Sequence, residues 1–334
     1  MLRTLAAAAA ATLALTACGI GPGGSDGDAL VVYSGRAENL IEPLLEMAED
    51  AGIKIDVRYG GSAELAAQIL EEGGNRRADV FLSQDAGALG ALAKEGLLRP
   101  IPASELDKVD ERYRAEDGTW VGVSGRARVL VYDPRAVDAK ELPPTVFALT
   151  GKEWEGKVGI APTNASFQAF VTAMRVTSGD AETKKWLTGI KRNAKVYENN
   201  IQIRDAVDAG EIPVGLVNHY YLYEKIAEVG AANVHAKHHF FRAGDPGALV
   251  NVSGVGILKG TKKQALAETF VTYLLSAEAQ GYFADRTKEY PLTDGAEPAE
   301  GLPPLASIKG PELDLSDLAS LKETLDLLAE VGLT

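Results

Sequence analysis

Two adjacent phenols, Tyr220 and Tyr221, are the side chains of this sequence best suited to chemistry. A phenolate oxygen is a hard donor that suits a hard cation such as Fe(III), and a bound metal displaces phenol protons although the ordinary pKa of tyrosine is about 10. The pair is therefore a candidate metal-ligating site. The residues alone also allow the alternative that both are half-buried tyrosines of a packed interface.

The segments on either side of the phenols indicate how the chain positions them. The apolar run Val214 to Val217 predicts a short core strand that ends at Asn218 and His219, and Tyr220 to Val229 predicts a helix. In an open α/β sheet, ligands bind at the edge where the strands end and the following helices begin. The free N–H groups at the start of a helix favour negative charge there. Both phenols are thus expected at a ligand-binding edge.

The composition is that of an ordinary globular protein with room for two lobes. The chain has 334 residues, with 34 basic against 47 acidic side chains and a formal net charge of −13, so a phosphate backbone would be repelled on average. Nucleic acid is therefore not an expected partner. After the N-terminal region, no segment approaches the roughly 20 apolar residues that a membrane-spanning helix needs.

The N-terminus is expected to be a processing segment. Residues 1–17 combine Arg3 with an apolar Ala/Leu run, which is typical of a secretory signal peptide. The sequence Leu15-Thr16-Ala17-Cys18 resembles a bacterial lipobox, which implies that Cys18 is lipidated and begins the mature chain. Cys18 is the single cysteine, so it forms no internal disulfide, and residues 18–28 read as a flexible Gly-rich linker. The expected localisation is extracytoplasmic, with the membrane contacted only through the lipid.

Strand and helix patterns alternate along the rest of the chain. This order predicts an α/β protein with a mainly parallel sheet, divided into a first lobe at 29–125, a second lobe at 126–253, and a return to the first lobe with C-terminal helices at 254–334. Trp120 to Tyr132 and Leu249 to Leu258 are the expected crossings between lobes, and Leu315 to Val331 is expected to be one closing amphipathic helix. In the first crossing, Arg126 and Arg128 share one face, either as anion contacts or as a solvated edge.

Motifs of common enzymes are missing from the sequence. There is no helix-spaced zinc pair, phosphate loop, dinucleotide fingerprint or Gly-x-Ser-x-Gly elbow, and the repeated Ser-Gly-Arg tripeptides lack a paired base. An enzyme is therefore not expected.

The ordered motifs of the chain resemble those of the bacterial ferric iron-binding proteins, the bacterial transferrin type of solute receptor for ABC importers. The resemblance covers Ala29 to Leu333 and rests on Val32-Tyr33-Ser34-Gly35-Arg36, Ala78-Asp79-Val80-Phe81, Val123-Ser124-Gly125-Arg126-Ala127-Arg128, Asn218-His219-Tyr220-Tyr221, Asp245-Pro246-Gly247-Ala248-Leu249-Val250 and Glu289-Tyr290-Pro291-Leu292. It implies a periplasmic-binding-protein-like fold, in which two α/β lobes joined by two crossover strands enclose a ligand cleft. It also implies that Tyr220 and Tyr221 bind Fe(III) and that a monomer delivers it to an ABC permease.

The sequence departs from this family at the donors expected from the first lobe. Ala37 stands where the best-known members carry a histidine, and Gln84 stands where they carry a glutamate. The adjacent Asp85 either turns into the site or, as we favour, caps its helix. With two certain donors, the site needs further oxygens, so the resemblance implies a synergistic anion (carbonate, phosphate or citrate). Its expected contacts are Arg36, Arg126, Thr163, Asn164, Ala165, Asn200 and Asn218.

Three other functions remain open on the sequence. A receptor of the same fold could bind an organic anion or polyamine without metal, which the missing histidine and glutamate would favour. An extracytoplasmic enzyme would need a catalytic pair that the sequence does not show. A sensor would present the same ligand to a membrane histidine kinase instead of a permease.

Overall fold

The computed structural model describes residues 28–333. The expected signal peptide at 1–17, Cys18 and all but the last residue of the 18–28 linker lie outside the described residues. The strands are β1 (Leu30–Ser34), β2 (Ile55–Tyr59), β3 (Val80–Ser83), β4 (Trp120–Tyr132), β5 (Val158–Ile160), β6 (Ala194–Val196), β7 (Val214–Asn218), β8 (Lys237–His239), β9 (Val250–Ile257) and β10 (Tyr290–Pro291). The helices are α1 (Glu38–Asp50), α2 (Ser62–Glu72), α3 (Ala86–Lys94), α4 (Ala103–Leu106), α5 (Ala165–Ser178), α6 (Asp180–Asn193), α7 (Asn200–Asp208), α8 (Tyr220–Val229), α9 (Gln264–Leu274), α10 (Ala277–Tyr282) and α11 (Leu321–Glu330).

The strands form one long mixed path in the order β2-β1-β3-β9-β4-β7-β5-β6, with β8 and β10 paired to β4. The predicted parallel pairing is present at both ends of this path, where β1 pairs with β2 and β3, and β5 pairs with β6 and β7. In the middle, β9 and β4 run antiparallel to their neighbours. The predicted α/β class is confirmed, and the sheet is mixed because the two crossing strands run back through it.

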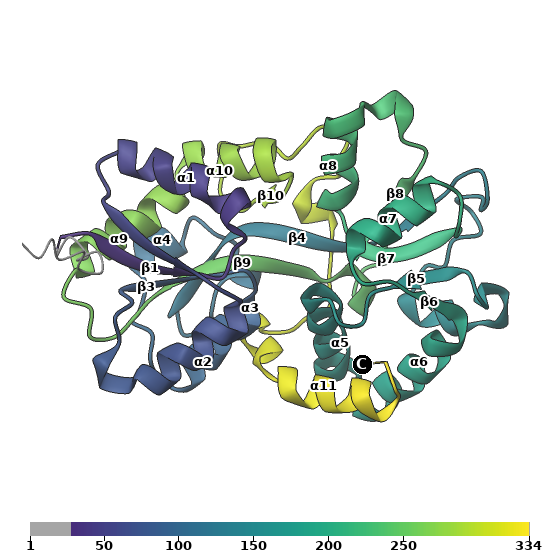
Figure 1. The fold of residues 1–334 in the computed structure, drawn as a ribbon, viewed down its shortest axis with the longest axis horizontal. Coiled ribbons are helices and arrows are strands. Elements are labelled where there is room, and N and C mark those ends of the chain that lie inside the picture. Colours follow the sequence, from purple (N-terminus) through teal and green to yellow (C-terminus); the bar gives the residue numbers. More distant parts are fainter. Residues whose placement is uncertain (1–27, 334) are drawn as a thin grey trace, which may run out of the picture.

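The long strand β4 connects the two halves of the molecule (Figure 1). Its first part, Trp120 to Ala127, pairs with β9, and its last part, Arg128 to Tyr132, pairs with β7. All 13 residues of β4 are buried, which explains why the strand tolerates so few polar side chains. The change of partner between Ala127 and Arg128 places both arginines of this strand at the junction of the halves.

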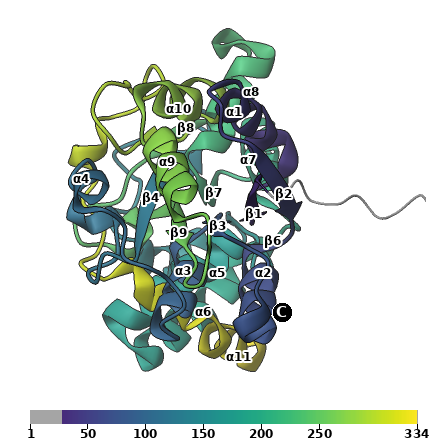
Figure 2. The same ribbon diagram turned by 90° about the vertical axis from the view of Figure 1, so that its left-hand side faces the viewer.

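Helices cover the strands on both sides. In both views, α1 and α10 lie on one side of the first half, and α2 and α3 lie on the other (Figures 1 and 2). Each of α1 and α2 buries an apolar stripe, formed in α1 by Ile41, Leu44, Leu45 and Ala48. No helix within residues 28–333 combines the length and the apolarity that crossing a membrane requires.

The C-terminal segment differs from the prediction of one helix over Leu315 to Val331. A short 3₁₀ helix (Leu315–Ala319) is followed by α11, and the two are separated at Ser320. The 3₁₀ helix packs on α3, where the buried Trp120 indole donates to Ser316 Oγ at 3.1 Å, whereas α11 packs on α5 and α6. The prediction of one helix was wrong here because the 3₁₀ helix packs mainly on α3 and also contacts α5, whereas α11 packs on α5 and α6.

Candidate metal centre

Tyr220 and Tyr221 begin helix α8, directly after strand β7 and the linking residue His219. Their ring centroids are 4.2 Å apart with an interplanar angle of 32°. Tyr220 is buried and Tyr221 half-buried, and both line a cavity of about 150 Å³. The other residues of its wall are Gln84, Asp85, Arg126, Arg128, Asn164, Ala165, Ser166, Asn218, Leu249 and Asn251. The structure thus brings both phenols to one enclosed space at the sheet edge.

His219 holds the start of α8 in place. Its Nδ1 accepts a hydrogen bond from the Ala127 backbone N–H at 3.0 Å, and its Nε2 lies 2.9 Å from the Lys288 carbonyl oxygen, which fixes the proton on Nε2. Burial lowers the pKa of His219 to about 4, so the ring is neutral at pH 7. Because both ring nitrogens are engaged, His219 is a structural support for the tyrosines and not a free donor.

Burial raises the pKa of Tyr220 well above the ordinary value for a phenol, and the neighbouring Tyr221 adds to this effect. The Arg126 guanidinium opposes the shift by favouring the phenolate. Tyr220 is therefore a protonated phenol at neutral pH unless a cation takes the place of its proton.

Two guanidinium groups from β4, those of Arg126 and Arg128, bring positive charge to the cavity. Arg126 donates through Nη2 to the Gln84 carbonyl oxygen, and its Nε lies 3.9 Å from Glu289 Oε1. Arg128 donates through Nη2 to the Leu216 carbonyl at 2.9 Å and through Nη1 to Ser166 Oγ at 3.3 Å. The Nε atoms of both arginines are buried without a hydrogen-bond partner in the described part of the chain. The cavity is therefore lined by two positively charged side chains, each of which keeps one N–H group without a partner among the described residues.

Burial lowers the pKa of Arg128 to about 9, an effect that Tyr221 and Tyr220 counteract. The side chain is only 1% exposed, and its guanidinium lies 5.8 Å and 5.5 Å from the ring centroids of Phe167 and Phe170. Arg128 is thus a protonated cation at pH 7, held beside the phenols by aromatic faces and a backbone carbonyl.

The residues expected to contact an anion do not all reach the cavity. Asn164, Ala165, Asn218 and Arg126 line it, whereas Thr163 is exposed outside it. Asn200 lies behind the wall, where its Nδ2 donates to Asn164 Oδ1 at 3.1 Å and to Ser166 Oγ at 2.9 Å. Thr163 and Asn200 therefore do not line the cavity and would not touch an anion in it. Asn200 nevertheless orients two polar groups at the start of α5.

Arg36 also lies away from the cavity. Its Nη1 donates to Ser253 Oγ and to Glu289 Oε1, the latter at 3.0 Å, and both charged side chains are buried. Ser124 Oγ donates to the second carboxylate oxygen of Glu289 at 2.6 Å. Arg36 therefore joins Ser253 of β9 to Glu289, the acid that also lies beside Arg126, and it is not among the residues that line the cavity.

Gln84 and Asp85 form the first-half wall of the cavity. Asp85 is the N-cap of α3, where its Oδ1 accepts from the Ala88 backbone N–H at 3.2 Å, so the predicted cap is confirmed. Burial raises the pKa of Asp85, while Arg126 acts in the opposite direction. Among residues 28–333, no group of three or more His, Cys, Asp or Glu side chains could hold a metal ion, which leaves the phenols as the strong donors of this site.

Comparison with known proteins decides the family of the chain. The family model described as "Bacterial extracellular solute-binding protein" matches residues 75–314. The chain belongs to this family. A relative from Serratia marcescens, named "Fe(3+)-binding periplasmic protein", is 33% identical over 306 residues, which cover 91% of this chain and 90% of the relative.

Solved structures of similar proteins agree with this membership. The structure of iron-bound HitA from Pseudomonas aeruginosa matches this solute-binding protein with a TM-score of 0.83 and 35% identity, over 91% of this chain and 99% of the other. Trichodesmium IdiA (FutA), solved in complex with iron and citrate ligands, matches with a TM-score of 0.80 and 30% identity, over 92% and 100% of the two chains. The predicted periplasmic-binding-protein-like fold of two α/β lobes is confirmed.

Four cavity residues of this solute-binding protein were not among the site residues that the sequence analysis selected: Arg128, Ser166, Leu249 and Asn251. Two signals in the sequence pointed toward them. Arg128 lies two residues beyond Arg126 and therefore on the same strand face, and Ser166 lies in the first turn of the helix that Asn164 caps. Leu249 and Asn251 carry no such signal, because only the pairing of β9 with β4 brings them to the junction.

Proposed function

We propose that this chain is an extracytoplasmic solute-binding protein that captures Fe(III) through Tyr220 and Tyr221 and delivers it to an ABC permease. The observation that carries the proposal is the pair of phenols, 4.2 Å apart between ring centroids, in a cavity that Arg126 and Arg128 also line. The relatives named for ferric iron binding, and the iron-bound neighbour with a TM-score of 0.83, support it. The protein binds its cargo and carries out no reaction on it.

The charges of the site support capture together with an anion. Two phenolates offset only part of the three positive charges of Fe(III), and the guanidiniums of Arg126 and Arg128 add positive charge to the same cavity. A carbonate, phosphate or citrate anion would neutralise this excess and would supply the oxygen ligands that two tyrosines cannot. Asn164, Ala165 and Asn218 line the cavity where such an anion would sit, and the iron and citrate ligands of the Trichodesmium neighbour support this part of the proposal.

Gln84 and Asp85 have different roles in this proposal. The Asp85 carboxylate is occupied as a helix cap, so Gln84 contributes at most a neutral oxygen beside the metal. Because one oxygen of Asp85 is engaged as the cap and Gln84 is neutral, an added anion would supply the negative charge and the oxygens that the first half provides only in part.

The experiment is a titration of metal-stripped protein with ferric nitrilotriacetate, with and without carbonate, phosphate or citrate, followed by visible absorption. A coloured tyrosinate-to-iron complex at one iron per chain, dependent on one of these anions, is expected. A titration that stays colourless with every anion would contradict the metal assignment and would leave an organic anion as the cargo. A polyamine in this cavity is disfavoured by Arg126 and Arg128, which would repel a cationic ligand.

We also propose the domain limits and the anchoring. The first lobe comprises 29–125, the second 126–253, and 254–334 contains the return to the first lobe and the C-terminal helices. Residues 1–17 act as a lipoprotein signal peptide, Cys18 carries the lipid, and the protein works as a monomer. Replacing Cys18 by Ala should move the protein from the membrane fraction to the soluble fraction, and unchanged fractionation would contradict the anchor.

A further inference from the structure

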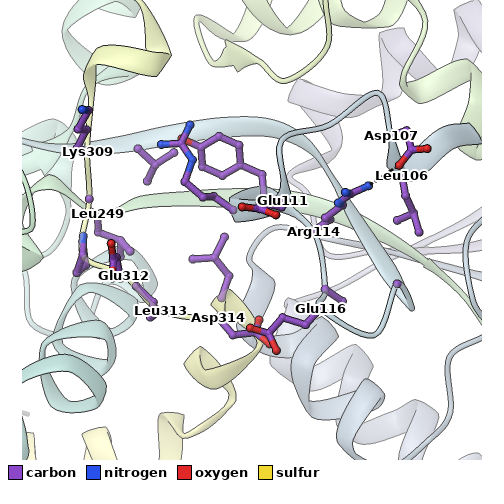
Figure 3. Close-up of a pocket in the computed structure, with 18 of the residues that line it drawn as sticks. Leu106, Asp107, Glu111, Arg114, Glu116, Leu249, Lys309, Glu312, Leu313 and Asp314 are labelled. Carbon is purple, nitrogen blue, oxygen red and sulfur yellow. Dashed lines mark hydrogen bonds and ion pairs between the residues drawn. The ribbon is translucent and has the colours of Figure 1, made fainter. Parts of the chain in front are cut away.

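A second and larger cavity lies outside the tyrosine site. Its volume is about 1110 Å³, slightly above the roughly 300–1000 Å³ of ordinary ligand pockets. Three stretches form its walls: residues 103–118, the start of β9 at Leu249 and Val250, and the C-terminal stretch 309–315 (Figure 3). Leu249 lines both this cavity and the tyrosine cavity.

The floor of this cavity is apolar and its margin is acidic. Tyr113, Ala115, Leu249, Val250 and Leu315 are buried side chains of the wall. Five carboxylates and three cationic groups line the space: Asp107, Glu111, Glu116, Glu312 and Asp314, with Arg112, Arg114 and Lys309. Figure 3 shows Glu111, Glu116, Glu312 and Asp314 distributed around the cavity, with Lys309 toward the edge of the view.

Two of the three cations are already neutralised. Arg114 pairs with Asp107 at 3.3 Å, and Arg112 pairs with Asp110 at 2.9 Å. Glu116 and Glu312 form no ion pair within residues 28–333, and Glu111 has only the neighbouring Arg112, which is already paired with Asp110, as a nearby cation. The exposed Lys309 likewise has no carboxylate partner among the described residues and offsets only one of them.

Tyr113 presents an unused polar group in this cavity. The residue is only 4% exposed, yet its hydroxyl has no hydrogen-bond partner in the described part of the chain. Burial raises the pKa of Tyr113 to about 12, so the group stays a neutral phenol whose oxygen can accept from an N–H donor. The side chain is largely buried in the cavity wall, and a hydroxyl without a protein partner is free to bond an ammonium group of a ligand in this space.

We propose that this cavity is a second ligand site, which takes a linear polyamine. The methylene chains of a polyamine would pack on Leu249, Val250 and Leu315, and its ammonium groups would reach the unpaired carboxylates and the Tyr113 hydroxyl. An anionic ligand would be repelled by the acidic margin. The tyrosine cavity does not suit the same ligand, because Arg126 and Arg128 line it. This site is independent of the proposed capture of iron.

Isothermal titration calorimetry of the full-length chain with spermidine, at fixed ionic strength, tests the proposal. Binding at one spermidine per chain is expected. The double variant Glu116→Gln/Glu312→Gln should weaken it about tenfold, as expected for the loss of two charge pairs of modest strength, and Tyr113→Phe should cause a smaller loss. The control Glu42→Gln/Glu46→Gln removes the same charge from exposed positions of α1 and should leave the affinity unchanged. Circular dichroism establishes that each variant is folded.

Three outcomes would overturn the assignment. The first is no heat beyond dilution with the unmodified protein. The second is an equal weakening by the α1 control, which would indicate a diffuse attraction to the acidic chain instead of a site. The third is loss of spermidine binding in the variant Tyr220→Phe/Tyr221→Phe, which would place the ligand in the tyrosine cavity.

Discussion

Nη1 of Arg36 donates to Oε1 of Glu289 at 3.0 Å, and the side chains of Arg36 and Glu289 are 0% and 2% exposed. Arg126 lies 3.9 Å from the same carboxylate oxygen, so one buried acid holds two arginines from different segments. Burial alone would raise the pKa of Glu289, but Arg36 and Arg126, with hydrogen bonds from Arg36 and Ser124, outweigh it and lower the pKa. The acid thus fixes how Arg126 is presented to the tyrosine cavity.

Replacing Glu289 by Gln should destabilise the protein, because the variant leaves Arg36 as a buried charge without a counter-charge. The expected loss in the free energy of unfolding at pH 7 is about 3 kcal/mol, as for other broken buried pairs. Urea denaturation measures it. The variant Glu297→Gln, which alters an acid outside this pair, is the control and should be neutral, and an equal loss in both would contradict a special role for Glu289.

The same pair predicts how stability depends on pH. Because the pKa of Glu289 is lowered in the folded state, its contribution is fully present above the unfolded value of 4.5 and is lost as the pH falls through the folded value. The unmodified protein should therefore lose more stability than Glu289→Gln on acidification below pH 4.5. Parallel pH profiles of the two proteins, measured by thermal unfolding, would refute the predicted shift.

Removing the phenol oxygens tests the metal ligands directly. Tyr220→Phe and Tyr221→Phe each delete one metal-binding oxygen while keeping the packed ring. Removing a residue that only hydrogen-bonds to a metal ligand costs up to roughly a hundredfold in metal affinity, so each of these variants should lose more than that. The double variant should show no tyrosinate-to-iron absorption. Competition with nitrilotriacetate measures the affinities. Tyr223→Phe, two positions beyond Tyr221 in α8 and outside the cavity wall, is the matched control and should bind as the unmodified protein does.

The sequence was sufficient to place the tyrosine pair but not everything around it. The apolar run before Asn218 and the helical pattern after it identify the junction of β7 and α8, because both signals are local. The cap by Asp85 follows equally from residue type and position. What the sequence missed depends on long-range packing: Arg36 meets a carboxylate 253 residues away, and no local pattern distinguishes that partner from a bound anion.

The contrast between local sequence patterns and long-range packing also explains the other predictions that the structure did not match. Thr163 and Asn200 have side chains suited to an anion, but the turn before α5 leaves one exposed and the fold places the other behind Asn164. The helical periodicity of Leu315 to Val331 continues through Ser320, and the break comes from contacts of the two parts with α3 and with α5 and α6. Residue patterns therefore predict elements and caps, whereas orientation into the cavity requires the tertiary structure.

Arg128 should matter for binding through its charge. It is a buried cation in the wall of the tyrosine cavity, so its removal would take away a positive charge and a donor for the anion. Arg128→Met should weaken ferric binding in the presence of anion by about tenfold or more, as expected for the loss of one charge-assisted contact. Arg192→Met, which removes the same charge from an exposed position of α6, should leave the affinity unchanged. Equal affinities of Arg128→Met and the unmodified protein would exclude this role.

Ferric affinity should rise with pH across the neutral range. The pKa of Tyr220 lies well above its ordinary value, so the free protein holds this phenol proton at pH 7 and must release it when the metal binds. Displacement of the Tyr220 proton should add about one to the increase in the logarithm of the affinity per pH unit, after correction for protonation of the competing chelator. In Tyr220→Phe the slope should fall by about one, because this proton is no longer displaced. A slope near zero in the unmodified protein would mean that iron binds without displacing phenol protons, and the tyrosines could then not be its ligands.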